Sequence, residues 1–179
     1  YGVSYLQGFN LFERKGDITF DYYRTDFQNQ VVVDWENPFE INFYNLGGKS
    51  FANSFQVEVN YNAFENFDLR TAYKYYDVQT DYNSGRLQRP LTPRHRFFAN
   101  AAYETNTKEN GSQWKFDATY NWLSEQRFPN TSLSVPQFQL PEETPTIGTL
   151  NLQVTKVFSP KFEVYVGGEN VTNVRQPNP

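Results

Sequence analysis

The sequence predicts an all-β fold, in which an antiparallel up-and-down meander of about eight strands forms part of a large transmembrane β-barrel. Three observations indicate this fold. Apolar and polar residues alternate over most of the chain, and short and long connections follow one another in strict order. Aromatic residues, which favour strands, make up 18% of a chain whose hydrophobic content is only 38%.

Alternation with a period of two is clearest in SQWKFDATYNWLSEQ, residues 112–126. In an extended strand, alternate side chains point to opposite faces of the sheet. One face would therefore be apolar with a tryptophan at each end, and the other would be charged and polar. The apolar positions are Trp114, Phe116, Ala118, Tyr120 and Trp122, and the polar positions are Lys115, Asp117, Thr119 and Asn121.

The remaining predicted strands show the same alternation, with different clarity. In chain order they are VSYLQGFNLF (3–12), DITFDYYRTDF (17–27), FQVEVNY (55–61), DLRTAYKYY (68–76), HRFFANAAYE (95–104), TLNLQVTKVF (149–158) and KFEVYVG (161–167). In TLNLQVTKVF, Lys156 interrupts an otherwise apolar face. No segment has a convincing helical period.

The predicted connections alternate between short and long. The short ones are RKG (14–16), FENF (64–67), TNTKENG (105–111) and SP (159–160), and the long ones are roughly 34–50, 81–93 and 126–146. Short turns at one edge and long loops at the other are typical of outer-membrane barrels.

The spacing of two tryptophans fits the thickness of a membrane. Trp114 and Trp122 are eight positions apart. At about 3.3 Å per residue and a tilt near 40°, this spans about 20 Å of height, close to the apolar band of about 25 Å. The two rings would then lie in the aromatic belts at the two interfaces. The alternative is a soluble β-sandwich, but a sandwich core uses branched aliphatic residues and its loops do not sort by length.

We therefore expect a lipid-facing outer surface and a water-filled interior. The outer set is Phe55, Val57, Val59, Trp114, Phe116, Leu150, Leu152, Val164 and Val166. The interior set is Glu58, Asn60, Arg70, Lys74, Tyr76, Lys115, Asp117, Glu163 and Tyr165. Because the interior set is bulky and charged, it suits a wide barrel better than a closed barrel of eight strands.

The order of the connections also predicts where the chain ends lie. A short connection joins both the first and the last pair of strands, so both ends would lie on the long-loop, extracellular side. A complete bacterial barrel normally has both ends on the other side. We expect a slice of a larger barrel, ending in QPNP (176–179), whose first and last strands do not pair with each other.

Composition argues against several classes of protein. No run of 18 apolar residues predicts a transmembrane helix, and YGVSYLQGFN does not look like a signal peptide. Cysteine is absent, which excludes disulfides and thiolate metal sites. The net charge is −4 without a basic stripe, so we expect no nucleic-acid partner.

No catalytic, cofactor-binding or metal site is predicted, and we expect the protein not to be an enzyme. His95, the single histidine, lies between two arginines without an identifiable acid or nucleophile. Glu142 and Glu143 are adjacent, so their side chains would point apart on an extended chain. GGEN (167–170) lacks the glycine spacing and the following helix of a phosphate loop.

Ligand contacts are expected in the long loops, where contact with lipid does not readily explain the aromatic residues, and basic and amide side chains lie in the same loops. The candidates are Trp35, Phe39, Phe43, Tyr44, Arg86, Arg89, Gln126 and Arg127. Loop packing and contact with lipid headgroups remain the alternative explanation for these residues.

Several blocks of the sequence resemble a known family. They include ITFDYYRTDFQNQVVVDWENP, FYNLGGKSFANSFQVEVNY, LQRPLTPRHRFFANAAYE and KFEVYVGGENVTNVRQPNP. The series resembles the C-terminal barrel strands of TonB-dependent outer-membrane receptors of the Bacteroidetes type, and the resemblance covers nearly the whole chain. Its most specific parts are RTDFQNQVVV and GGENVTN.

The resemblance implies a barrel of about 22 strands in the bacterial outer membrane. This chain would supply roughly strands 14 to 21, without the plug, the segment that contacts TonB, or the last strand. The implied function is energised uptake of a scarce nutrient, such as a siderophore, haem, cobalamin, a peptide or a glycan. The implied partners are membrane lipid, the protein's own plug and remaining strands, TonB and the nutrient.

Two other functions remain open at this point. One is a passive or adhesive outer-membrane barrel without a plug, and the other is a soluble carbohydrate-binding β-module. The sequence does not identify the ligand.

Overall fold

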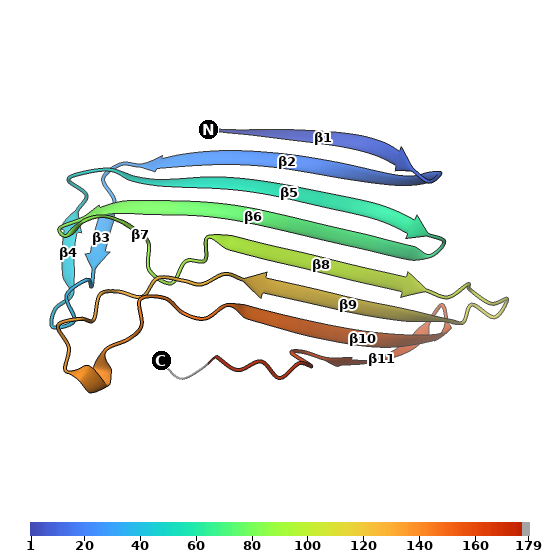
Figure 1. The fold of residues 1–179 in the computed structure, drawn as a ribbon. Helices are drawn as coiled ribbons and strands as arrows, with labels where there is room; N and C mark the ends of the chain where they lie inside the picture. The colour runs from blue at the N-terminus through green and yellow to red at the C-terminus, as the bar shows by residue number, and fades with distance from the viewer. Residues whose placement is uncertain (177–179) are drawn as a thin grey trace.

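The computed structural model describes residues 1–176, so the last three residues of QPNP lie outside the described part. Its main sheet is a curved antiparallel meander, as Figure 1 shows. In spatial order the strands are β1 (Gly2–Leu11), β2 (Arg14–Phe27), β5 (Ser50–Phe64), β6 (Phe67–Tyr82), β8 (His95–Glu104), β9 (Gln113–Leu123), β10 (Ile147–Ser159) and β11 (Phe162–Gly168). The prediction of eight antiparallel strands is confirmed.

Three further strands form within the long loops. β7 (Gly85–Gln88) pairs with the end of β6, and β3 (Val31–Asp34) pairs with β4 (Asn42–Asn45) in a separate hairpin. The helical content of residues 1–176 is one short 3-10 turn, η1 (Pro136–Phe138). None of the helical structure described there is long and apolar enough to cross a membrane.

The connections sort by length as the sequence predicts. Short turns join β1 to β2, β5 to β6, β8 to β9, and β10 to β11, all at the end that we call the short-turn end. The first loop (28–49), the second loop (83–94) and the third loop (124–146) gather at the opposite, long-loop end, on the left of Figure 1.

The position of the first turn differs from the prediction. The turn consists of Phe12 and Glu13, both with positive φ, whereas RKG (14–16) begins β2. Gly16 looks like a turn residue in the sequence, but in the sheet it lies opposite Phe9. A Cβ atom on Gly16 would lie 2.5 Å from the Phe9 ring, so this glycine makes room for an aromatic side chain on the neighbouring strand.

The predicted strand 17–27 ends where expected, but the first loop begins at residue 28 rather than near residue 34. β2 stops at Phe27, which pairs with Ser50, and Asn29 adopts a positive φ of 55°. The chain therefore leaves the sheet, and VVVD (31–34) forms the first strand of the separate hairpin.

Strand register places the predicted outer residues on one face of the sheet. Val57 pairs with Phe20 and Tyr73, and Leu152 pairs with Ala118. Directly paired residues of antiparallel strands point to the same face, so this apolar face continues across the whole sheet. All nine predicted outer residues lie on it, which confirms that they share a surface: Phe55, Val57, Val59, Trp114, Phe116, Leu150, Leu152, Val164 and Val166.

The apolar face is not a sandwich core. Leu152 is 42% exposed and Phe116 is also 42% exposed. In residues 1–176 no second sheet covers this face, and the only other sheet is the β3–β4 hairpin. The buried hydrophobic residues are few and lie at the long-loop end: Val32, Ala52, Val78 and Tyr82.

The sheet remains open. β1 pairs with β2 alone and β11 pairs with β10 alone within the described residues, so no ladder joins the first strand to the last. This agrees with the expectation that the chain does not close on itself.

Candidate functional site

The face opposite the apolar one carries a network of polar side chains. Asn60 donates to Asp17 at 3.0 Å, and Arg70 forms an ion pair with Glu58 at 2.9 Å. Further along the sheet, Asn100 donates to Asp117 at 2.9 Å. Polar groups on adjacent strands therefore satisfy one another across what we call the polar face.

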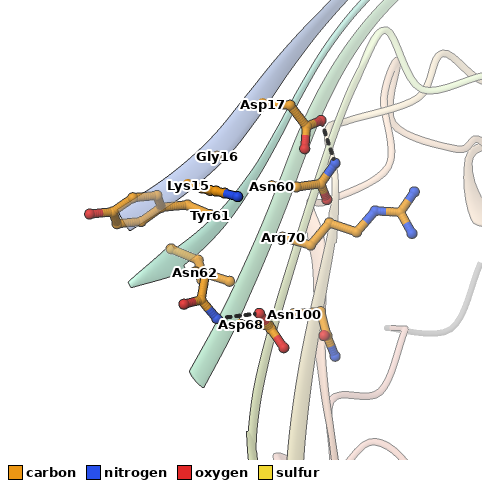
Figure 2. Close-up of a pocket in the computed structure, with 10 residues that line it drawn as sticks. Lys15, Gly16, Asp17, Asn60, Tyr61, Asn62, Asp68, Arg70 and Asn100 are labelled. Carbon is orange, nitrogen blue, oxygen red and sulfur yellow. Dashed lines mark hydrogen bonds between the residues drawn. The ribbon is translucent and has the colours of Figure 1, made fainter. Parts of the chain in front are cut away.

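A pocket of about 450 Å³ opens on this face near the short-turn end. Figure 2 shows Asp17, Asn60 and Arg70 projecting to one side of the curved strands, whereas Tyr61 projects to the other. The pocket is lined by both signs of charge, including Lys15 and Asp17. Such a lining suits water or another polar surface rather than an apolar ligand.

The β3–β4 hairpin at the long-loop end is organised around one carboxylate. Asp34 is only 5% exposed because it points to the same side of the hairpin as the buried Val32. Its carboxylate accepts hydrogen bonds from the Tyr44 hydroxyl at 2.8 Å and from the backbone N–H groups of Glu36 and Asn83. Burial, together with the bond to Asp34, raises the pKa of Tyr44 to about 12. Asp34 thus ties the first loop to the start of the second.

Arg127 connects all three long loops. Its guanidinium donates two hydrogen bonds to Glu36 of the first loop, at 2.7 and 2.8 Å. Its Nε donates to the backbone carbonyl of Gln88 in the second-loop region at 2.8 Å. The side chains of Arg127 and Glu36 are only 20% and 6% exposed, so this two-pronged pair is well shielded from water.

The backbone around this ion pair strengthens the same connection. Leu91 N–H donates to the Arg127 carbonyl at 2.9 Å, and Asn130 N–H donates to Glu36 at 3.2 Å. We call Arg127, Glu36 and their backbone partners the loop clamp. It holds segments that are 91 residues apart in the sequence.

Two pockets lie beside the loop clamp. One of about 280 Å³ is bordered by Trp35 and Arg89 together with Tyr82 and the first strand of the hairpin. The other, of about 520 Å³, lies within the third loop between Arg127 and the segment from Gln139 to Glu143. Both pockets are candidate places for a small molecule at the long-loop end.

The comparisons with known proteins agree with this architecture. A family model described as "TonB dependent receptor-like, beta-barrel" matches residues 1–171. The chain belongs to this family. Searches of curated proteins and of solved structures found no significant match. Members of the family form β-barrels of the bacterial outer membrane and act as transporters rather than enzymes.

In this TonB-dependent receptor barrel segment, some predicted ligand residues are exposed or border a pocket, whereas others are already bonded to protein groups. Phe39 and Phe43 are strongly exposed, and Trp35 and Arg89 border the smaller pocket. Arg86 is paired with Asp81 at 2.7 Å, Tyr44 is bonded to Asp34, and Arg127 belongs to the loop clamp. The backbone of Gln126 pairs with Thr144. Their contact with a ligand stays a prediction.

The structure also shows where the residues lie for which no catalytic or metal-binding role is predicted. His95 lies on the apolar face, with Nδ1 2.6 Å from the Tyr73 hydroxyl. Glu142 and Glu143 line the larger pocket of the third loop. Among residues 1–176, no cluster of three or more His, Asp or Glu side chains is arranged to hold a metal ion.

Sequence reasoning missed the acidic half of the loop clamp. Glu36 occurs in WENP, where it looks like an ordinary solvated loop residue. The burial of Asp34, by contrast, could have been predicted, because the alternation in VVVD puts its side chain on the same side as that of Val32. No local pattern could have paired Glu36 with Arg127.

Proposed function

We propose that this chain forms part of the wall of an energised nutrient transporter in the outer membrane. The observation that carries the proposal is the division of the sheet into two continuous faces. The apolar face, with Phe116 and Leu152 exposed, suits contact with lipid, whereas the polar face suits a wet interior. A wall between lipid and water requires both faces on the same strands.

The polar face would meet the plug of the transporter. Arg70 is 57% exposed although it pairs with Glu58, so its guanidinium keeps donors free for another surface. The pocket around Asp17 and Asn60 offers carboxylate and amide groups in the same region. Polar contacts of this type can be broken and remade in water, which a plug that rearranges during transport requires.

The ligand would be captured at the long-loop end before the plug moves. The loop clamp makes the three loops a preorganised platform, which lowers the entropy cost of binding. Trp35 and Arg89 offer an aromatic surface and a cation at one pocket. The proposed cargo is a scarce nutrient: a siderophore, haem, cobalamin, a peptide or a glycan. Contact between TonB and the plug would supply energy from the inner-membrane proton-motive force.

The rest of the barrel would complete both edges of the sheet. β1 and β11 each have one neighbour among the described strands, and unpaired strand edges are not tolerated in hydrocarbon. We propose that the chain provides roughly strands 14 to 21 of a barrel of about 22, of the Bacteroidetes type, with the plug and the last strand elsewhere in the protein.

Growth on defined nutrients tests this proposal. A strain lacking the full-length gene would be compared with the complemented strain on separate siderophore, haem, cobalamin, peptide and glycan sources. We expect one nutrient to support growth only when both the gene and a functional TonB are present. The transport proposal fails if the gene never affects uptake.

The same experiment separates the alternatives. A passive barrel would give gene-dependent uptake that persists without TonB, and an adhesive barrel would give no uptake at all. Recovery of the full-length protein in a soluble fraction without detergent would favour a carbohydrate-binding module instead.

A further inference from the structure

A lysine interrupts the apolar face near the short-turn end. Lys156 of β10 pairs with Trp114 of β9 and with Val164 of β11, both on the apolar face. β10 ends three positions later at Ser159, next to the short turn. The lysine therefore lies close to one boundary of the apolar face rather than at its middle.

Two aromatic rings lie next to the Lys156 ammonium. Its Nζ atom is 4.8 Å from the centre of the Trp114 ring and 5.9 Å from that of Phe158. Among the described residues, the ion pairs involve other cations and leave the Lys156 ammonium without a carboxylate. Contact with two ring faces stabilises the cation, but it does not neutralise the charge.

Further aromatic rings lie next to one another on the apolar face at this end of the sheet. The ring centroids of Tyr103 and Phe116 are 6.3 Å apart, those of Phe116 and Trp114 are 6.4 Å apart, and those of Phe158 and Phe162 are 5.5 Å apart. Aromatic belts of this kind mark the boundary between hydrocarbon and headgroups. A charged lysine facing lipid is costly at mid-depth but costs little near the interface, so this position fits the headgroup layer.

We propose that Lys156, Trp114 and Phe158 form a binding site for the phosphate of a phospholipid headgroup, in the leaflet at the short-turn end. The ammonium would meet the phosphate, and the rings and Val164 would lie along the glycerol and upper acyl chains. A soluble acidic partner would leave the apolar residues on either side of Lys156 uncovered, whereas a phospholipid satisfies the charge and the apolar surface together. This inference rests on the proposal that the apolar face contacts lipid.

Lipid competition measured beside the lysine tests the site. The chain contains no cysteine, so Val164→Cys, introduced into a cysteine-free full-length receptor, would carry a single bimane label on the cross-strand neighbour of Lys156. Quenching by brominated phosphatidylglycerol and by brominated phosphatidylcholine gives the relative binding constants of the two lipids at this position. We expect a preference for phosphatidylglycerol that falls about fivefold in Lys156→Gln and is retained in Lys156→Arg.

Lys115→Gln is the matched control. Lys115 is the residue after Trp114, pairs with Thr155 beside Lys156 and points to the polar face, where it forms an ion pair with Glu104 at 3.2 Å. This variant should leave the lipid preference unchanged. An unchanged preference in Lys156→Gln, or an equal loss in Lys115→Gln, overturns the headgroup site.

Two further outcomes distinguish failure of the headgroup site from failure of the proposal that the apolar face contacts lipid. If excess inorganic phosphate at matched ionic strength removes the preference, the site binds a free anion and the headgroup assignment is wrong. If brominated chains of either lipid fail to quench the label, the apolar face does not meet lipid, and the proposed membrane wall fails as well.

Discussion

Replacing Arg127 by methionine should loosen all three long loops at once. The change leaves the Glu36 carboxylate, which is 6% exposed, without its cation. Removing one partner of a buried ion pair costs about 3 to 5 kcal/mol, and because Arg127 itself is 20% exposed we expect the lower end, about 3 kcal/mol. If that energy limits opening of the loops, amide exchange there should accelerate about 100-fold.

Hydrogen exchange on the full-length receptor measures this effect in each loop separately. The reporters are the N–H groups of Glu36, Leu91 and Asn130, which belong to the first, second and third loops and donate to Asp34, Arg127 and Glu36. All three should exchange faster in Arg127→Met, while the long strands keep their protection.

Two comparison variants sharpen the result. Arg86→Met breaks a more exposed ion pair with Asp81, so it should accelerate exchange far less than Arg127→Met and leave the third loop unaffected. Adding Glu36→Gln to Arg127→Met removes the stranded charge, so the double variant should be less perturbed than the sum of the single ones. Faster exchange confined to the third loop in Arg127→Met would refute the reasoning, because the clamp would then not join the loops.

Three further predictions concern the faces and the hairpin. Leu152→Arg should lower the unfolding free energy in bilayers by about 2 to 4 kcal/mol if the residue lies near mid-depth, whereas Gln153→Arg on the polar face should change it little; equal effects would contradict the assignment of faces. Because the pKa of Tyr44 is raised to about 12, the stability it contributes should be complete below about pH 10 and disappear as pH rises towards 12; this pH dependence of loop exchange should be absent in Tyr44→Phe. Gly16→Ala would place a Cβ atom 2.5 Å from an aromatic ring of β1, so denaturant titration should show a loss of about 1 to 3 kcal/mol, whereas Gly47→Ala, with open space around it, should be nearly neutral.

Much of the sheet could be predicted because its signal is local. The alternation in residues 113–123 gives both the strand and its two faces, since side-chain direction in a strand depends only on parity. The turn at RKG was misplaced for the same reason. Gly16 leaves room for the Phe9 ring on the neighbouring strand, and this contact cannot be seen from the residues next to Gly16 in the sequence, where a glycine indicates a turn.

The candidate site was less predictable because its chemistry depends on pairs that are distant in the sequence. Arg127 is a predicted ligand contact, yet in the structure it forms an ion pair with Glu36, 91 residues away in the sequence. Phe39 and Phe43 do lie exposed in the first loop, in agreement with an aromatic surface there. Which charges remain available to a ligand is decided by how the loops fold onto one another.

The sequence by itself determined the strand meander, the two faces and the separation of short turns from long loops. Each of these follows from residue parity or from turn-forming residues within a few positions. The tertiary structure alone decided that VVVD leaves the sheet to form a hairpin, that the loop clamp joins three loops, and that Lys156 lies against Trp114. These arrangements depend on strand register and on the path of long loops, which bring together groups that no periodicity in the sequence connects.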